Sequence, residues 1–286
     1  FDKKWIYFKD KGPIEKSKYL NIEKNLSSKA LKRRKINNKV VDFYDLDVYL
    51  EYINQITKIK VKIISISKWL NAIVVLANES QINRIKKLDF VIKINDVRRL
   101  KNNTFNISSN VKEITDINTI RDISESQIQQ FNIDVLHNQN LNGDGVSILI
   151  IDTGFTLNHE SLNHLQNRTV VSNDLINDDD IVENETNQDV NGQHDHGTYV
   201  LSVLAGNSTN YIGVCKNANF LLAKTENLVL EDVIEEYHFM EAIEWGESQG
   251  ADIITASLGY IDWYEASDLN GLNAVTTIAM NIAFRD

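Results

Sequence analysis

Short apolar runs alternate with amphipathic stretches over the first hundred residues. Four runs are rich in β-branched and aromatic residues and predict strands: WIYF (5–8), VKIISI (61–66), AIVVLA (72–77) and FVIKINDV (90–97). Between them, residues 45–59 and 79–88 place apolar side chains at helical spacing. The resulting order, strand-helix-strand-strand-helix-strand, is that of a ferredoxin-like α+β domain, which we expect over residues 1–100.

The stretch from 101 to 123 breaks this pattern. It is rich in Asn, Ser and Thr and has no sustained period. We expect a linker here, between two domains.

From residue 124 to residue 286 the pattern changes to continuous apolar runs. VSILII (146–151), NFLLA (219–223) and ADIITASLG (251–259) predict strands buried on both faces. Helices are predicted over 197–206, 231–250 and 273–284. Alternating strands and helices of this kind indicate an α/β domain, with a parallel sheet and flanking helices.

Two of these helices carry well-defined apolar positions. The helix over 197–206 places Val200, Val203 and Leu204 at helical spacing, and we expect Gly206 to cap it. The helix over 231–250 begins with acidic residues, ends at Gly250, and places three apolar residues on one face. Those residues are Val233, Tyr237 and Met240.

Charge divides the chain at the same place as the hydrophobic pattern. Residues 1–101 hold 24 Lys and Arg against 11 Asp and Glu, whereas residues 102–286 hold 6 against 29. The net charges of +13 and −23 predict that the two regions dock electrostatically. Nucleic-acid binding is the weaker interpretation of the basic region, because no motif of the known nucleic-acid-binding modules accompanies it.

Composition excludes several other classes. An apolar fraction of 42% with 24% charged residues is typical of a globular protein. No apolar run reaches the roughly 20 residues of a membrane span. The single cysteine, Cys215, allows neither an internal disulfide nor a CxxC site. The chain begins Phe1-Asp2-Lys3, from which we expect a processed N-terminus whose secretion signal has been removed.

Three short motifs carry candidate chemistry. Asp152 follows a buried strand and precedes Thr153-Gly154, so its carboxylate is expected at the carboxyl end of the sheet. His196 precedes Gly197-Thr198 and an apolar helix, where the helix dipole favours the neutral imidazole that a general base needs. Ser257, Leu258 and Gly259 follow another strand, where backbone groups could pair with an extended peptide. Singly, each motif is equally compatible with a structural role.

Together, and in this order, the motifs resemble those of the subtilisin-like serine proteases, the subtilase family. The stretches GDGVSILIIDTGF, HGTYVLSVLAG, IGVCKNANFLLAKTE and EWGESQGADIITASLGY are similar to subtilases of the Bacteroidetes type. In the first region, ALKRR and SKWLNAIVV resemble the pro-segments of that subgroup. The resemblance implies a pro-domain followed by the N-terminal part of a subtilisin-like catalytic domain.

The resemblance also implies roles for particular residues. Asp152 is the triad aspartate and His196 the general base of a serine endopeptidase, whereas Ser257, Leu258 and Gly259 line the substrate-binding strand. Residues 1–100 are an inhibitor and intramolecular chaperone that packs on the catalytic domain, and residues 101–123 contain the processing region. A secreted, periplasmic or cell-surface location is implied, with peptides or proteins as substrates.

The sequence departs from the family at its C-terminal side. No G-T-S motif for the nucleophile occurs, and the chain stops at Asp286, before the expected oxyanion asparagine. We weigh three interpretations: a fragment of an active protease, a chain whose remainder is a second polypeptide, and an inactive relative that acts as a binding or inhibitory protein. In each case we expect this chain alone to be inactive.

Metal chemistry gives the remaining alternatives. Calcium commonly stabilises the family, and the acidic stretch NDDDIVENETNQD (177–189) could supply oxygen ligands, although a solvated acidic loop is the simpler interpretation. The pair His194 and His196 could instead serve a metal-dependent hydrolase. No further ligand cluster is spaced to complete such a site, so no metal ligand is assigned.

Overall fold

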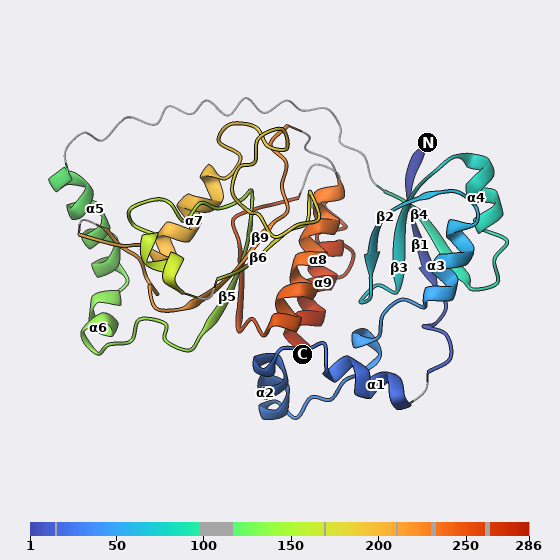
Figure 1. Cartoon of the computed structure of the whole chain (residues 1–286), viewed down its shortest axis with the longest axis horizontal. Helices are drawn as coiled ribbons and strands as arrows, with labels where there is room; N and C mark the ends of the chain where they lie inside the picture. Colours follow the sequence, from blue (N-terminus) through green and yellow to red (C-terminus); the bar gives the residue numbers. More distant parts are fainter. Residues whose placement is uncertain are drawn as a thin grey trace. The chain divides into compact units, whose positions relative to one another are not determined.

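The computed structural model of the 286-residue chain describes residues 1–14, 16–97, 117–168, 170–209, 211–229, 233–260 and 264–285. They form two compact units (Figure 1). The first unit combines Phe1–Lys101 with Asp232–Gly250 and Tyr260–Asp286. The second combines Asn102–Glu231 with Ala251–Gly259. Most of the expected linker, residues 101–116, lies outside the described residues.

The first unit contains a four-stranded antiparallel sheet in the order β2-β3-β1-β4. Its strands are β1 (Asp2–Phe8), β2 (Lys62–Ser67), β3 (Ala72–Ala77) and β4 (Val91–Asp96). Helices α3 (Leu50–Thr57) and α4 (Glu79–Ile85) connect them as predicted, and the strand order is the ferredoxin-like one. Two further helices, α1 (Lys16–Glu23) and α2 (Ser28–Ile36), were not predicted.

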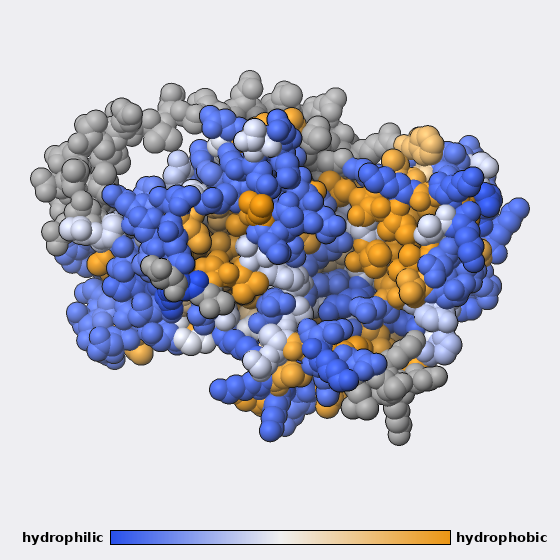
Figure 2. Space-filling model, in the orientation of Figure 1, coloured by the Kyte–Doolittle hydropathy of each residue, from blue (hydrophilic) through white to orange (hydrophobic). Residues whose placement is uncertain are grey.

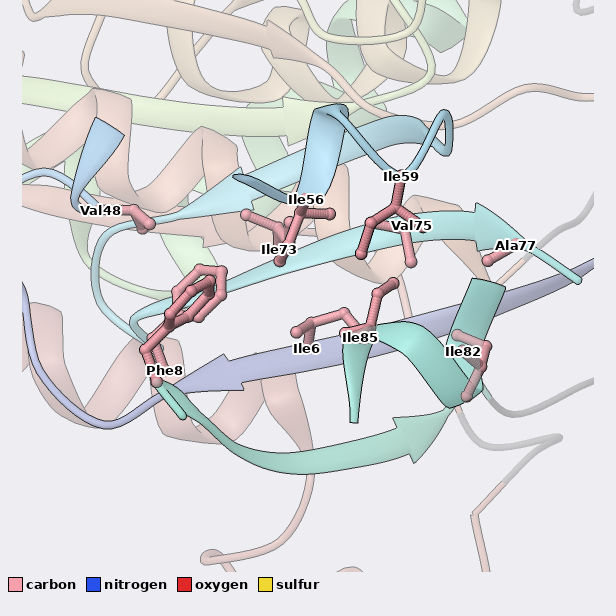
Figure 3. Packing of buried hydrophobic residues seen from close by; sticks show 11 residues of the cluster. Ile6, Phe8, Val48, Ile56, Ile59, Ile73, Val75, Ala77, Ile82 and Ile85 are labelled. Carbon is pink, nitrogen blue, oxygen red and sulfur yellow. The ribbon is translucent and has the colours of Figure 1, made fainter. Parts of the chain in front are cut away.

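The apolar core of this unit lies between the sheet and the two connecting helices (Figure 3). Ile6 and Phe8 of β1 and Ile73 and Val75 of β3 pack against Ile56 and its neighbours. The alternate residues of β1 face the other way: Trp5 meets Tyr237 edge-on, with ring centroids 4.5 Å apart. The sheet is covered on both faces, so β3 needs apolar side chains on both of them, which explains why its sequence is an unbroken apolar run.

The helix predicted over 45–59 is shorter than expected. A 3-10 turn, η1 (Phe43–Asp45), comes first, and α3 begins only at Leu50. The Asp45 carboxylate accepts a hydrogen bond from the Asp42 backbone N–H and pairs with Arg34, so it holds a tight turn instead of starting a helix. Val48 and Ile59 are nevertheless buried, as their spacing predicted.

Helix α8 (Ile234–Gln249) covers the second face of this sheet. Its apolar residues Val233, Tyr237 and Met240 are buried as predicted, and Gly250 ends it in the left-handed conformation. The helix also directs carboxylates at the first hundred residues. Glu244 accepts a hydrogen bond from Ser67 Oγ at 2.6 Å, and Glu247 pairs with Arg33 and Arg34 at 2.5 and 2.9 Å. Helix α9 (Val275–Arg285) packs beside α8.

The second unit contains a parallel sheet in the order β10-β5-β9-β6. Its strands are β5 (Ser147–Asp152), β6 (Val171–Asp174), β9 (Asn219–Lys224) and β10 (Ile253–Ala256). The predicted parallel α/β sheet is confirmed, although β6 was not predicted. The other elements are α5 (Ile117–Gln130), α6 (Ile133–Asn138), η2 (Asn163–Asn167), α7 (Asp195–Ala205), β7 (Asn207–Ser208) and β8 (Tyr211–Ile212). Since α5 begins at Ile117, the end of the expected linker is helical.

Helix α7 packs on β5. Of its three predicted apolar residues, Val200 and Leu204 are partly buried against the core, whereas Val203 is 53% exposed. Leu201 and Ala205, an i, i+4 pair that was not predicted, are fully buried. Gly206 caps the helix, as expected.

The visible face is mostly hydrophilic, and hydrophobic residues show both over the N-terminal sheet and over the unit with the parallel sheet (Figure 2). No helix in the described ranges is both long and apolar enough to cross a membrane.

Candidate active site

Asp152 is the last residue of the central strand β5, and it is completely buried. Its Oδ1 lies 2.7 Å from Nδ1 of His196, the second residue of α7. The same oxygen accepts the backbone N–H of Thr153 at 2.7 Å, which fixes the carboxylate. The second oxygen, Oδ2, is buried without a hydrogen-bond partner among the described residues.

The His196 ring is half exposed, so one side faces the carboxylate and the other is open. An ionised carboxylate can only accept, and the bond therefore places the ring proton on Nδ1. Nε2 then carries a lone pair. This is the tautomer that a general base requires.

The D-T-G and H-G-T motifs contact one another directly. Gly197 donates its N–H to Thr153 Oγ1 at 3.3 Å, and Thr198 Oγ1 accepts the N–H of Thr156 at 2.9 Å. A Cβ on Gly197 would lie 2.1 Å from the carbonyl oxygen of Gly154. Only glycine allows the two turns to approach this closely.

His194 has a different environment. Its Nδ1 accepts the backbone N–H of Asn184 at 2.9 Å, and its own N–H donates to Asn184 Oδ1 at 2.9 Å. Both bonds fix the loop ahead of α7. Within the described ranges, no group of three or more His, Cys, Asp or Glu side chains is placed to hold a metal ion.

Ser257, Leu258 and Gly259 lie just beyond the end of β10, an edge strand of the sheet. The parallel register pairs Ala256 with Ile151, so this segment leaves the sheet at the same edge as Asp152. Ser257 and Gly259 are exposed, and nothing lies within 4 Å of a Cβ built on Gly259. The predicted strand 251–259 is thus shorter than expected and stops where β5 stops.

A buried lysine forms an ion pair with the acidic stretch 177–189. Lys224, at the end of β9, is fully buried and lies 2.7 Å from both Asp174 Oδ2 and Asp189 Oδ1. Glu183 Oε1 accepts bonds from Thr156 and from the Leu157 backbone. Glu183 and Asp189 thus have protein donors, whereas Glu185 Oε2 is buried without a hydrogen-bond partner among the described residues.

Sequence reasoning missed two buried side chains near the site, Lys224 and Gln193. Gln193 donates to the carbonyl oxygens of Thr153 and Glu226 at 2.8 and 2.7 Å and accepts the N–H of Leu228 at 3.1 Å. One signal was available. Lys224 ends a buried apolar run just as Asp152 does.

Two family models match the chain. A model described as the peptidase S8 propeptide domain of Bacteroidota matches residues 3–116, and one described as the subtilase family matches residues 143–282. Halolysin of Haloferax mediterranei is 30% identical over 135 residues, which are 46% of this chain and 24% of halolysin. Subtilisin DY of Bacillus licheniformis is 30% identical over 128 residues, 44% of this chain and 41% of that protein. The chain spans less than half the length of these curated relatives.

Solved structures with the same fold cover nearly the whole chain. Fervidolysin of Fervidobacterium pennivorans, a keratinolytic enzyme related to subtilisin, aligns with 99% of this chain and 38% of its own, at a TM-score of 0.54 and 11% identity. The epidermin leader peptide processing serine protease of Staphylococcus aureus aligns with 98% of this chain and 56% of its own, at 0.52 and 13%. At these identities the likeness concerns the fold alone. The two family models give the assignment: the chain belongs to the subtilase family, with a propeptide domain preceding the subtilase region.

Proposed function

We propose that this chain comprises the pro-domain and the first part of the catalytic domain of a serine endopeptidase, and that Asp152 and His196 are two members of its Asp–His–Ser triad. The observation that carries the proposal is the 2.7 Å hydrogen bond between His196 Nδ1 and the buried Asp152 Oδ1. The subtilase match over residues 143–282 gives this pair its context.

In the proposed reaction, His196 Nε2 removes the proton of a serine hydroxyl as the oxygen attacks the peptide carbonyl. Asp152 holds the imidazole in the reactive tautomer and stabilises the imidazolium that forms. The proton then passes from Nε2 to the leaving amine. The nucleophilic serine and the oxyanion donor are not assigned to any residue of this chain, which we therefore expect to be inactive alone.

Ser257, Leu258 and Gly259 are proposed to bind the substrate. They continue from an edge strand, so their backbone can add an extended peptide to the sheet next to Asp152. Residues 1–100 are proposed to act as inhibitor and folding chaperone, with processing between 101 and 123. The contacts of Glu244 and Glu247 with the first hundred residues support this role. We propose a secreted, periplasmic or cell-surface location.

The proposal is tested in the full-length protein that contains this chain, by casein hydrolysis and by labelling with a fluorophosphonate. Asp152→Asn favours the wrong tautomer and is expected to lower kcat by roughly 10⁴, as the equivalent change does in other serine proteases. His196→Ala is expected to abolish labelling and turnover.

His194→Ala is the matched control. It removes one of the two bonds to Asn184 but no proton carrier, so we expect its kcat to fall by no more than about a hundredfold, far less than in His196→Ala. Loss of activity in His194→Ala together with inhibition by a zinc chelator would instead support a metal-dependent hydrolase. Hydrolysis by the 286-residue chain alone, blocked by a serine-directed inhibitor, would contradict the assignment of the nucleophile to residues outside it.

A further inference from the structure

Three charged residues lie in one row across the carboxyl edge of the parallel sheet. The register pairs Asp152 of β5 with Lys224 of β9, and Lys224 with Asp174 of β6. All three are completely buried. Lys224 directs its ammonium to Asp174 Oδ2 and Asp189 Oδ1, both at 2.7 Å. Buried charges persist only when they are paired in this way.

Lys224 stays charged in this position. Burial alone would lower the pKa of its ammonium, but the hydrogen bonds and charges of Asp174 and Asp189 outweigh burial and raise it. The ammonium of Lys224, at the end of β9, therefore places a positive charge beside the acidic loop that follows β6. Removal of either partner would leave an uncompensated buried charge, so the loop carboxylates and Lys224 depend on each other.

A short chain of contacts leads from Asp189 to His196. Asp189 Oδ2 accepts the N–H of Glu185 at 2.9 Å, and Asn184 Nδ2 donates to the Val190 carbonyl at 3.0 Å. Asn184 in turn makes two 2.9 Å bonds to His194, the N-cap of α7. His196 lies in the first turn of that helix. The position of its ring thus depends on the loop that Lys224 tethers.

We propose that Lys224 is a positioning residue for His196: its buried ammonium fixes the 174–189 loop and, through it, the first turn of α7 against Asp152. This inference rests on the proposed function, because it concerns the same Asp–His pair. In this arrangement the ammonium of Lys224, and not a bound cation, holds the acidic loop in place.

The variant Asp189→Ala tests whether the Lys224–Asp189 ion pair positions His196. Lys224→Met would leave two buried carboxylates without a counterion and can fail to fold, whereas Asp189→Ala leaves the Lys224–Asp174 pair neutral. Asp180→Ala is the matched control, since Asp180 is an exposed carboxylate of the same loop. Each variant is compared in the 286-residue chain by NMR and in the full-length protein by kinetics.

In the NMR experiment, Asp189→Ala is expected to lose the downfield Nδ1–H resonance of His196, whereas Asp180→Ala keeps it. In the kinetic experiment, Asp189→Ala is expected to lower kcat by roughly tenfold to a hundredfold with little change in KM, because misplacement of a catalytic group by about 1 Å has effects of that size. Asp189→Glu, which restores the carboxylate, is expected to recover part of the loss.

Two results would overturn the inference. One is an Asp189→Ala protein that is less stable but has an unchanged His196 signature and kcat, which would make the cluster purely structural. The other is a wild-type protein whose melting temperature rises with millimolar calcium and falls with a chelator, with the response lost in Asp189→Ala, since the loop would then be held by a cation. If the full-length protein shows no hydrolysis, the proposed function fails, while the NMR comparison still decides the role of Lys224.

Discussion

Gly197 determines how closely His196 can approach Asp152. The residue follows His196 in the first turn of α7, and its backbone lies against the D-T-G turn that follows β5. A Cβ there would lie 2.1 Å from the Gly154 carbonyl oxygen and 3.0 Å from Asp152 Cβ. Both obstacles are backbone or short side-chain atoms that cannot rotate away, so a side chain would displace the helix.

We therefore expect Gly197→Ala to lower the stability of the 286-residue chain by about 1–3 kcal/mol, the usual cost of overpacking. Separation of His196 from Asp152 is expected to reduce kcat of the full-length protein by at least about a hundredfold. Gly259→Ala is the control for stability, since nothing lies within 4 Å of its Cβ position. Equal melting temperatures for the two variants would contradict this account of the turn.

At the scale of single residues, the sequence predicted Asp152 and His196 because Asp152 follows a predicted strand and His196 precedes a predicted helix. Both elements have a clear hydrophobic pattern. Lys224 and Gln193 were not predicted, because their partners lie between 33 and 50 residues away along the chain. Nothing in the local pattern distinguishes a buried lysine at the end of a strand from a solvated one. Only the sheet register, which pairs β9 with β6, reveals the difference.

Helix α8 shows what hydrophobic periodicity misses at the scale of an element. Its apolar face was predicted, yet Glu244 and Glu247 are also buried, because the helix packs against a second set of residues from the first hundred. Similarly, the predicted helix 45–59 lost its first turn, since Asp45 is engaged with Arg34. In both cases a tertiary contact outweighs the local preference.

Glu244 makes the stability of the first unit depend on pH. Burial raises the pKa of its carboxyl, while the bonds from Ser67 and the Trp69 backbone oppose the rise. Between the unfolded and the folded pKa the folded state binds more protons, so this contribution to stability is present at low pH and is lost as pH rises.

Glu244→Gln cannot titrate, so its unfolding free energy relative to the wild type is expected to increase from pH 5 to pH 7.5, by about 1.4 kcal/mol for each unit of the pKa difference crossed. Urea unfolding followed by tryptophan fluorescence measures this, because Trp5, Trp69 and Trp245 belong to the first unit. Glu51→Gln, on the exposed side of α3, is the control. A pH-independent difference between Glu244→Gln and the wild type would contradict the prediction.

For the molecule as a whole, the division by charge describes only part of the organisation. The sequence places a boundary between residues 100 and 124, whereas the compact unit formed by the first hundred residues also includes α8 and α9. The basic region carries two kinds of charge: buried pairs, such as Arg34 with Glu247 at 2.9 Å, and exposed lysines, such as Lys32 and Lys35 of α2. These two kinds of charge respond differently to salt.

Exposed charges steer association and are screened, because the Debye length falls from about 10 Å at 0.1 M salt to about 3 Å at 1 M. Buried pairs are screened far less and mainly hold the complex once it has formed.

The test uses two separate polypeptides, residues 1–100 and residues 124–286. We expect them to bind with an on-rate that falls roughly tenfold or more between 0.05 and 0.5 M salt. The off-rate should change little. Surface plasmon resonance separates the two rates. Lys32→Glu with Lys35→Glu should mainly lower the on-rate. Arg34→Met leaves the buried Asp45 carboxylate without its arginine and Glu247 with Arg33 alone, and should mainly raise the off-rate. An on-rate indifferent to salt would show that the opposite net charges of the two regions do not drive their docking.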